Sequence, residues 1–248
     1  MLSRLLRYAP VAGDLDASVS VLDVCCGRDG LSCVFNGARF AGQDTAFDGP
    51  VVPAMFGVRT NGGRFPWADG AFDTVVCVNG VEQVAPGERA AFVAECARVA
   101  ARRLLISCET TAGPSAAELA RLCTLRGFTT RPWPQVNALL TSLLTFSDEN
   151  PSFAGQSSAE FAVNRAAWVQ VLNAARFGDG PRTGFELLRD EPREPLVDPG
   201  RFDASAAAAL ECVRCGTRLR LETAVGLRCL GCGMIPAREA TGTWDMTR

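Results

Sequence analysis

The chain has 248 residues, of which 48% are hydrophobic and 21% charged, and its formal net charge is −2 at pH 7. This composition is typical of a globular protein with a substantial core, and the length suits one large domain with an appendage, or two domains. The small net charge excludes a strong whole-chain attraction to nucleic acid or to an anionic membrane. There is no apolar stretch of 18 residues and no signal-peptide pattern, so we expect a cytoplasmic chain that does not associate with membranes.

Two residue types are absent. The sequence has no histidine, and all 25 basic residues are arginine. A general base must therefore be a carboxylate, a cysteine or a tyrosine, and a metal site must use cysteine or carboxylate ligands. Seven of the 11 cysteines are scattered through apolar segments, where buried free thiols are expected, namely Cys25, Cys26, Cys33, Cys77, Cys96, Cys108 and Cys123.

The first half of the chain alternates apolar runs with helical patterns. Strands are predicted over 19–25, 38–44, 72–78 and 103–108, and uninterrupted apolar strands are typical of parallel sheets covered on both faces. Helices are predicted over 86–100, with Pro86 at the first position, and over 115–127. The second helix opens with a capping box of Ser115 and Glu118 and stops at Gly127. This alternation predicts an α/β fold with a doubly wound, mostly parallel sheet.

Beyond residue 130 the pattern is weaker. A further helix is predicted over 158–177, and residues 179–203, with four prolines, are predicted to form a polar connector. Tyr8, the only tyrosine, precedes the first predicted strand, where it could cover a ligand or lie on the surface. Trp133 and Trp168 are expected in the core, and the acids in 147–151 in a solvated turn.

Polar side chains follow several of the predicted strands. In open α/β sheets, ligands bind at the carboxyl ends of the strands, where Asp23, Asp44 and Asn61 are expected. The turn over 25–30 has small residues, so its backbone N–H groups can approach a ligand. Asp44 follows this turn by about 20 residues, the position of a ribose-binding carboxylate in a nucleotide-binding βαβ unit.

Four segments in this order, "VLDVCCGRDGLS", "FAGQD", "TNGGRFPWADGAFDTVVCVNGVEQV" and "ERAAFVAECARVAARRLLIS", resemble a class I S-adenosylmethionine-dependent methyltransferase of the quinone-methyltransferase-like (type 11) branch, with a Rossmann-like methyltransferase fold. The resemblance covers about residues 18 to 130. It implies that the turn after Asp23, with Cys25, Gly27 and Gly30, holds the methionine part of S-adenosylmethionine. By the same resemblance, Asp44 holds the ribose hydroxyls, Asn61 with Gly62 the adenine edge, and Asn79 lines the sulfonium side.

The chain departs from the family pattern at four positions. Cys25 and Asp29 stand where the family has the first and third turn glycines, Asn61 replaces the usual acid, and Gln83 stands where many relatives have histidine. No catalytic base can be named. Three functions remain open: methylation of a small molecule or metabolite, which the charge favours; methylation of RNA or a translation factor; and a non-catalytic protein with this fold that works by association.

The C-terminal region carries the second motif. Cys212-x2-Cys215 and Cys229-x2-Cys232 are separated by 13 residues, a spacing typical of zinc sites, and each pair is followed by Gly216 or Gly233, which permits a tight turn. The alternating segment between the pairs predicts a hairpin. Four thiolates would form a closed, structural Zn2+ site; two redox-active or incidental cysteine pairs are the alternative. We therefore expect a methyltransferase-like domain over 1–200 and a zinc ribbon over 205–248.

This region also resembles the small zinc-ribbon module that activates some tRNA, rRNA and release-factor methyltransferases. The usual Asp-Gly-Ile-Pro tail of that module is missing, so activation of a partner is not implied. Docking of nucleic acid on the ribbon remains an alternative to a small-molecule acceptor. The oligomeric state has no signature in the sequence.

Overall fold

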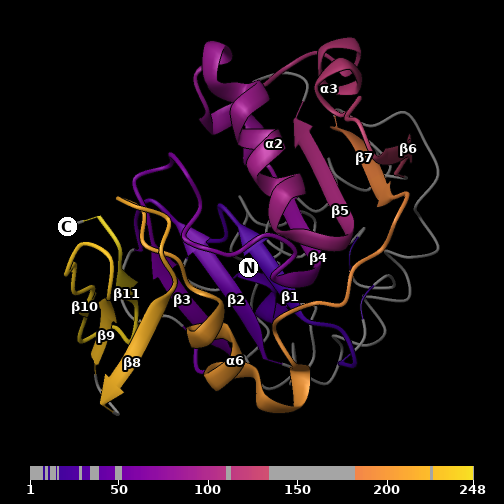
Figure 1. Ribbon diagram of the computed structural model, residues 1–248. Helices are drawn as coiled ribbons and strands as arrows, with labels where there is room; N and C mark the ends of the chain where they lie inside the picture. The colour runs from indigo at the N-terminus through magenta and orange to yellow at the C-terminus, as the bar shows by residue number, and fades with distance from the viewer. Residues whose placement is uncertain are drawn as a thin grey trace, which may run out of the picture.

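The computed structural model describes residues 8, 11, 15, 17–27, 30–33, 39–47, 52–109, 113–133, 182–223 and 226–247. In this part of the chain the main feature is a nine-stranded sheet with the order β10-β11-β3-β2-β1-β4-β5-β7-β6 (Figure 1). Its strands are β1 (Val21–Val24), β2 (Phe40–Asp44), β3 (Met55–Arg59), β4 (Phe72–Val78), β5 (Ala100–Glu109), β6 (Phe128–Pro132), β7 (Arg182–Arg189), β10 (Ala237–Arg238) and β11 (Trp244–Asp245).

The sheet is mostly parallel. Strands β1 to β5 and β11 run in one direction, whereas β7 is antiparallel to both of its neighbours and β10 is antiparallel to β11. From β1 the order runs outward to β2 and β3 on one side and to β4 and β5 on the other. The order reverses at β1, as in a doubly wound sheet, and the predicted fold class is confirmed. No helix among the described residues is both long and apolar enough to span a bilayer.

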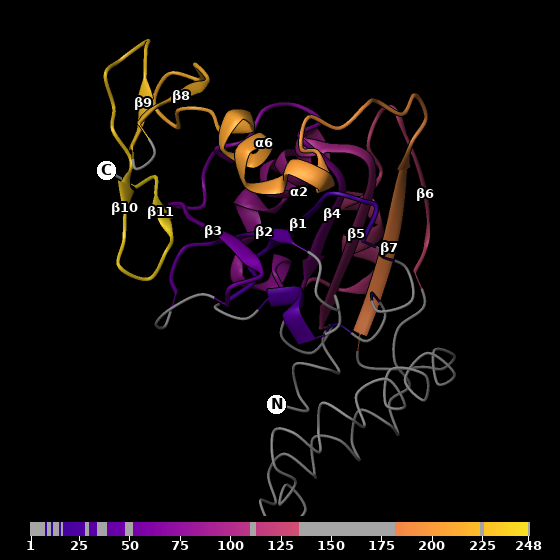
Figure 2. The ribbon, with the colours of Figure 1, turned by 90° about the horizontal axis from the view of Figure 1, so that it is seen from below.

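Two separate apolar clusters cover the two faces of the sheet. On one face, strand residues such as Leu22 and Val75 pack against α2 (Arg89–Val99), α3 (Ala116–Leu122) and α6 (Phe202–Ala209). On the other, Val21, Val76 and Leu105 pack with Tyr8 and with Leu31 of a 3-10 turn (Gly30–Cys33). Figure 2 shows α2 and α6 on the same side of the sheet. Alternate residues of β1, β4 and β5 are therefore buried on opposite faces.

The predicted elements of the first half are present with shifted ends. Strand β4 has the predicted bounds, and α2 follows a 3-10 turn (Pro86–Glu88) that takes up the start of its predicted helix. The Ser115 Oγ accepts the Glu118 N–H at 3.2 Å, which is one half of the predicted capping box, while the Glu118 carboxylate pairs with Arg89 at 3.1 Å. Helix α3 ends at Leu122, earlier than predicted, while Gly127 has a φ of +80° in the turn before β6. The helix predicted over 158–177 and the turn predicted over 147–151 lie outside the described residues.

The predicted connector over 179–203 is wrong for residues 182–189. Residues Arg182–Arg189 form β7, which lies between β5 and β6 and is antiparallel to both. Glu186 of β7 is only 5% exposed. Its carboxylate pairs with Arg103 of β5 and Arg131 of β6, and these partners make a buried acid tolerable in the middle of a sheet.

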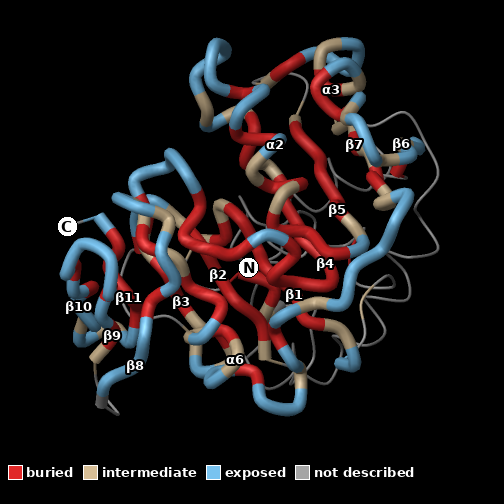
Figure 3. The backbone as a smooth tube through the Cα atoms, viewed as in Figure 1, coloured by how far each residue is buried: buried red, intermediate tan, exposed pale blue. Residues whose placement is uncertain are grey.

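The C-terminal part of the chain, here called the tail (residues 202–223 and 226–247), packs into the first cluster. It begins with α6 and continues with the predicted hairpin, β8 (Leu219–Thr223) and β9 (Gly226–Cys229). It ends with β11, whose Trp244 pairs with Val58 of β3 in parallel register. Trp244 and hairpin residues such as Leu219 and Leu227 belong to the same core as the sheet strands. Figure 3 shows the central strands of the sheet mostly buried and β8 mostly exposed.

Candidate functional site

A cavity of about 830 Å3 opens at the carboxyl ends of β1, β2 and β3, against the amino-terminal half of α2. This is the edge at which doubly wound sheets bind ligands. Apolar and polar groups both line it. The lining residues are Val24, Cys25, Gln43, Asp44, Thr45, Thr60, Asn61, Gly62, Gly63, Arg64, Phe65, Gln83, Val84, Ala85, Glu88, Ala91, Phe92, Ala94 and Glu95.

Asp44 ties the end of β2 to the turn that follows β1. Its Oδ2 accepts the Gly27 N–H at 2.8 Å, and its Oδ1 accepts the Ala46 N–H at 3.2 Å. The Cys25 N–H donates to the Gln43 carbonyl at 2.8 Å, so the two strand ends are held by backbone as well as by side chain. An ionised carboxylate has about four acceptor positions, so Asp44 can accept further hydrogen bonds from a ligand in the cavity.

Two residues with strained backbone conformations lie at the carboxyl ends of β1 and β4. Cys25 and Asn79, which follow β1 and β4, have φ values of +58° and +56°, in the left-handed region that favours glycine. A Cβ placed on Gly80 would come within 2.6 Å of the Cys77 Sγ and 3.1 Å of the Cys25 Sγ. The two turns therefore touch, and only a glycine fits at position 80. Strained residues that the surrounding structure holds in place are found mostly at ligand sites.

Four of the eight predicted cofactor residues line the cavity: Cys25, Asp44, Asn61 and Gly62. Gly27 reaches it through its bond to Asp44. Asn79 is not among the lining residues, but its Oδ1 is buried and has no hydrogen-bond partner among the described residues, while its N–H donates to the Ser107 carbonyl at 3.0 Å.

The remaining two predicted residues, Asp23 and Gly30, are not among the lining residues. Asp23 is fully buried in the middle of β1 and accepts a hydrogen bond from the Tyr8 hydroxyl at 2.8 Å. Tyr8 is 2% exposed, which excludes a surface position for it. Gly30 has a φ of +47°, and a Cβ there would lie 2.8 Å from a ring carbon of Phe40. Both residues shape the core behind the turn. Asp29 lies outside the described residues.

The cavity lining also includes residues that sequence reasoning did not single out, among them Gln43 of β2, Phe92 of α2 and Arg64. Gln43 accepts the Trp67 indole N–H at 2.8 Å, and the Phe65 ring meets the Phe92 ring edge-on with centroids 5.7 Å apart. Gln43 directly precedes Asp44, so its position at a strand end was the available signal. Arg64 is the cation among the described lining residues, and nothing in its sequence neighbourhood marks it.

Glu95 of α2 is the acid with a shifted pKa at this cavity. Burial works to raise its pKa, but hydrogen bonds from Arg98 and from the Phe65 N–H outweigh it, so the pKa lies below its usual value of 4.5. Glu95 therefore stays ionised and serves to hold the loop after β3 rather than to exchange protons.

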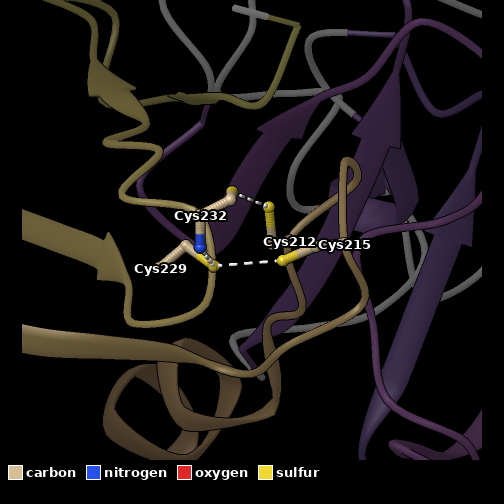
Figure 4. A group of neighbouring side chains, drawn as sticks. All are labelled: Cys212, Cys215, Cys229 and Cys232. Carbon is tan, nitrogen blue, oxygen red and sulfur yellow. Dashed lines mark hydrogen bonds between the residues drawn. The ribbon is translucent and has the colours of Figure 1, made fainter.

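The four clustered cysteines converge on one point (Figure 4). All four Sγ atoms lie within 4.8 Å of one another, with Cys212 and Cys232 at 3.5 Å and Cys215 and Cys229 at 3.4 Å. Each Cys-x2-Cys segment forms a tight turn. The Gly216 N–H donates to the Cys212 carbonyl at 2.8 Å, and the Gly233 N–H donates to the Cys229 carbonyl at 2.9 Å. These glycines have φ values of +72° and +75°.

This arrangement fits a tetrahedral metal ion. With Zn–S bonds of about 2.3 Å, neighbouring sulfurs of a tetrahedral site lie about 3.8 Å apart, close to the spacing of the two pairs. The other cysteines differ in their surroundings. Cys26, Cys77, Cys96, Cys108 and Cys123 are buried as expected, Cys25 is half-buried, and the side chain of Cys33 lies outside the description. Burial, followed by the charge of Glu82, raises the pKa of Cys108 to about 12, so this thiol stays protonated.

No family model matches the sequence, and no curated protein matches it. Several solved structures are similar. One is an S-adenosylmethionine-dependent methyltransferase from Aquifex aeolicus, with 18% identity, 54% of this chain and 86% of that chain covered, and a TM-score of 0.42. Another is magnesium protoporphyrin IX methyltransferase from Synechocystis with bound S-adenosylmethionine, with 16% identity, 76% and 77% covered, and a TM-score of 0.41.

A third is the complex of a methyltransferase activator from Haloferax volcanii with its proposed methyltransferase, with 13% identity, 77% of this chain and 92% of that chain covered, and a TM-score of 0.47. At these identities the fold of the present chain is defined by its own strand order, and nothing about its reaction follows from the likeness.

Proposed function

We propose that the chain is an S-adenosylmethionine-dependent methyltransferase that acts on a small molecule. The observation that carries this is the position of Asp44, next to the Gly27 N–H at the rim of a cavity of about 830 Å3 at the ends of β1 and β2. A carboxylate at the end of the second strand suits the two hydroxyls of a ribose, and the cavity has the size of a site for a cofactor or small ligand.

The residues around the cavity have separate tasks in this proposal. Asp44 would accept the ribose hydroxyls, Asn61 and Gly62 would face the adenine edge, and the Cys25–Gly27 turn would lie along the methionine part. When bound, S-adenosylmethionine supplies an electrophilic methyl group. The chain contributes orientation and the exclusion of water, with Phe65 and Phe92 as apolar walls. The Oδ1 of Asn79, which has no hydrogen-bond partner among the described residues, would accept a hydrogen bond only from a ligand group that enters beyond the present cavity lining.

We further propose that the four-cysteine cluster holds a structural Zn2+ ion, in a zinc ribbon over residues 205–248. The four-thiolate donor set and its spacing favour this ion, and the absence of an open ligand position among the four described cysteines argues for a structural role. Methyl transfer would be confined to the α/β part of the chain, within residues 1–200.

Calorimetry with S-adenosylmethionine and with S-adenosylhomocysteine tests the proposed cofactor. Both should bind, and Asp44→Asn should weaken binding about 10- to 100-fold, the range for a lost hydrogen bond to a charged group. Asp190→Asn is the matched control, since Asp190 lies away from this cavity and accepts from Thr129. Failure of both ligands to bind the unmodified chain would instead favour a non-catalytic protein that works by association.

Nucleic acid as the methyl acceptor is the second candidate, because of one feature of the hairpin. Arg220 and Arg228 lie directly opposite each other on β8 and β9, and both are exposed. Like charges in such a pair destabilise a hairpin. Glu222, 3.7 Å from Arg228, offsets part of the repulsion, and an anionic ligand such as a phosphate backbone would relieve the rest. Binding of single-stranded RNA that weakens steeply with salt would favour this candidate, and salt-independent or absent binding would exclude it.

A further inference from the structure

The loop that follows β3 (residues 60–65, here the β3 loop) is attached to the tail on its amino-terminal side. Strand β3 pairs with β11 of the tail, and the Met246 N–H donates to the Arg59 carbonyl at 3.0 Å. The Arg59 side chain pairs with Glu239 at 2.6 Å. The start of the loop that carries Asn61 and Gly62 is therefore fixed by residues near the end of the tail.

The carboxyl-terminal side of the β3 loop is attached to another part of the tail. The Glu211 N–H donates to the Pro66 carbonyl at 2.9 Å, and Trp67 forms an isolated antiparallel bridge with Leu210. The Ala68 N–H donates to the Ala209 carbonyl at 2.9 Å. The loop therefore spans between two segments of the tail, one on each side of the four cysteines in the sequence.

A side-chain contact joins the β3 loop to the cysteine cluster itself. Arg64, which lines the cavity, forms an ion pair with Glu211 at 2.8 Å. The Glu211 side chain is 14% exposed and the Arg64 side chain 50%, so solvent screens this pair in part. A Cβ on Gly216 would lie 3.4 Å from Arg64 Nη1, so the first cysteine turn packs against the guanidinium.

Glu211 directly precedes Cys212, and Gly216 closes the turn that Cys212 begins. Cys215 and Cys232 are exposed, so their side chains are not held in place by burial, and we expect an ion to be the main constraint that keeps them near the other two sulfurs. Loosening of the first turn would free Glu211 and the guanidinium that it orients. The conformation of the cysteine cluster and the conformation of the cavity wall therefore both depend on residues 211–216.

We propose that Glu211 is a positioning residue for the β3 loop, and that through Glu211 and Arg64 the occupancy of the four-cysteine site by its metal ion sets the affinity of the cavity for an adenosyl ligand. This rests on the proposed cofactor and metal. Because binding linkage is reciprocal, an adenosyl ligand must also raise the affinity of the cysteines for the ion by the same factor.

The first test compares the metal-loaded and the metal-stripped full chain by calorimetry with S-adenosylhomocysteine. Couplings between sites are typically about 5- to 150-fold, and we expect binding at least about tenfold weaker after metal removal. In the reciprocal test, S-adenosylhomocysteine should slow the transfer of Zn2+ to a competing chelator. Equal affinities with and without the ion in a folded chain would overturn the proposal.

The second test keeps the ion in place. Glu211→Gln should bind S-adenosylhomocysteine about three- to fivefold more weakly, as expected for one partly exposed ion pair, while retaining Zn2+. Glu222→Gln is the matched control, since Glu222 lies in the hairpin, 3.7 Å from Arg228, and away from the β3 loop. A double-mutant cycle with Arg64→Gln should be non-additive. A lowered melting temperature with unchanged affinity would reduce Glu211 to a merely structural residue.

A ligand-free measurement separates this proposal from the proposed cofactor. Amide hydrogen exchange over residues 60–65 should be faster in Glu211→Gln and in the metal-stripped chain than in the metal-loaded chain, and unchanged in Glu222→Gln. If the metal-loaded chain binds no adenosyl ligand but the exchange rates follow this pattern, the cofactor proposal fails and the positioning role stands. Uniform exchange in all four samples would contradict the positioning role itself.

Discussion

The Glu95 carboxylate of α2 accepts the backbone N–H of Phe65 at 2.8 Å and also two hydrogen bonds from Arg98, each at 2.8 Å. Arg98 in turn donates to the carbonyls of Phe65 and Trp67, at 3.1 and 2.7 Å. Helix α2 thus holds the end of the β3 loop, which the tail also contacts through Pro66 and Ala68. The β3 loop, which forms part of the cavity wall, is therefore held by contacts with α2 and by contacts with the tail. Weakening either set of contacts should change the conformation of the cavity wall.

Replacing Glu95 tests the support from α2. Since the pKa of Glu95 is held below 4.5, its stabilising contribution is present above about pH 4.5 and is lost as the pH falls through the lowered value. Glu95→Gln should lower the free energy of unfolding at pH 7 by about 1.5–3 kcal/mol, the range for hydrogen bonds to a charged group. Urea unfolding at pH 7, 5 and 3.5 should show the difference shrinking with acid; a constant difference would contradict this explanation.

Two glycines provide a matched pair for the turn after β1. Gly30→Ala combines a φ of +47° with a Cβ only 2.9 Å from the Asp23 Oδ2 and 2.8 Å from Phe40. It should cost at least about 2 kcal/mol, from left-handed strain and overpacking together. Gly87→Ala meets nothing within 4 Å and should be neutral or stabilising by up to about 1 kcal/mol. Denaturant midpoints of the two variants give the comparison, and similar losses would show that the tight packing around Gly30 relaxes easily.

Removal of one cysteine ligand tests the metal site. The unmodified chain should retain about one Zn2+ ion after dialysis against a weak chelator. Cys232→Ser should retain far less, because serine is a poor ligand for Zn2+. Cys25→Ser, which lies at the cavity and not in the cluster, should retain the ion. Elemental analysis of both variants decides the point. A Cys232→Ser variant with full metal content would exclude a four-thiolate site.

The opposed arginines of the hairpin predict a stabilising substitution. Arg220→Thr removes one partner of the exposed Arg220–Arg228 pair and should raise the free energy of unfolding by about 0.2–1 kcal/mol at low salt, with a smaller gain in high salt. Arg126→Thr, in the turn before β6, has no such cross-strand neighbour in the described part of the chain and serves as control. Thermal melts at two salt concentrations measure both. Destabilisation by Arg220→Thr would mean that the arginine stem contributes packing that outweighs the repulsion.

Sequence reasoning succeeded where one segment carries its own signal. Strand β4 is an unbroken apolar run between turn residues, and the polar residues at strand ends led to Asp44 and Asn61 because parallel strands bring their carboxyl ends to one edge. The cysteine spacing located the four-sulfur cluster, since two tight turns joined by a hairpin leave few other arrangements.

It failed where the signal depends on distant partners. Strand β3 is five residues long with Gly57 at its centre, and β7 carries Glu186, which looks exposed until Arg103 and Arg131 are placed beside it. The two-residue strand β11 has no pattern of its own and exists only because β3 offers it an edge. The Arg64–Glu211 pair joins residues 147 positions apart, and no local property of either residue indicates it.

The pairing of β11 with β3 has a consequence for the order of assembly. The Arg59 and Glu239 side chains meet across a sequence separation of 180 residues, so during synthesis the outer hydrogen-bonding groups of β3 stay open until nearly all of the intervening chain has left the ribosome. Fragments that stop before residue 244 would leave the outer edge of β3 unpaired and prone to aggregation through pairing with strands of other chains. The outer edge of β3 is thus covered only after residues about 180 positions further along the chain have been made.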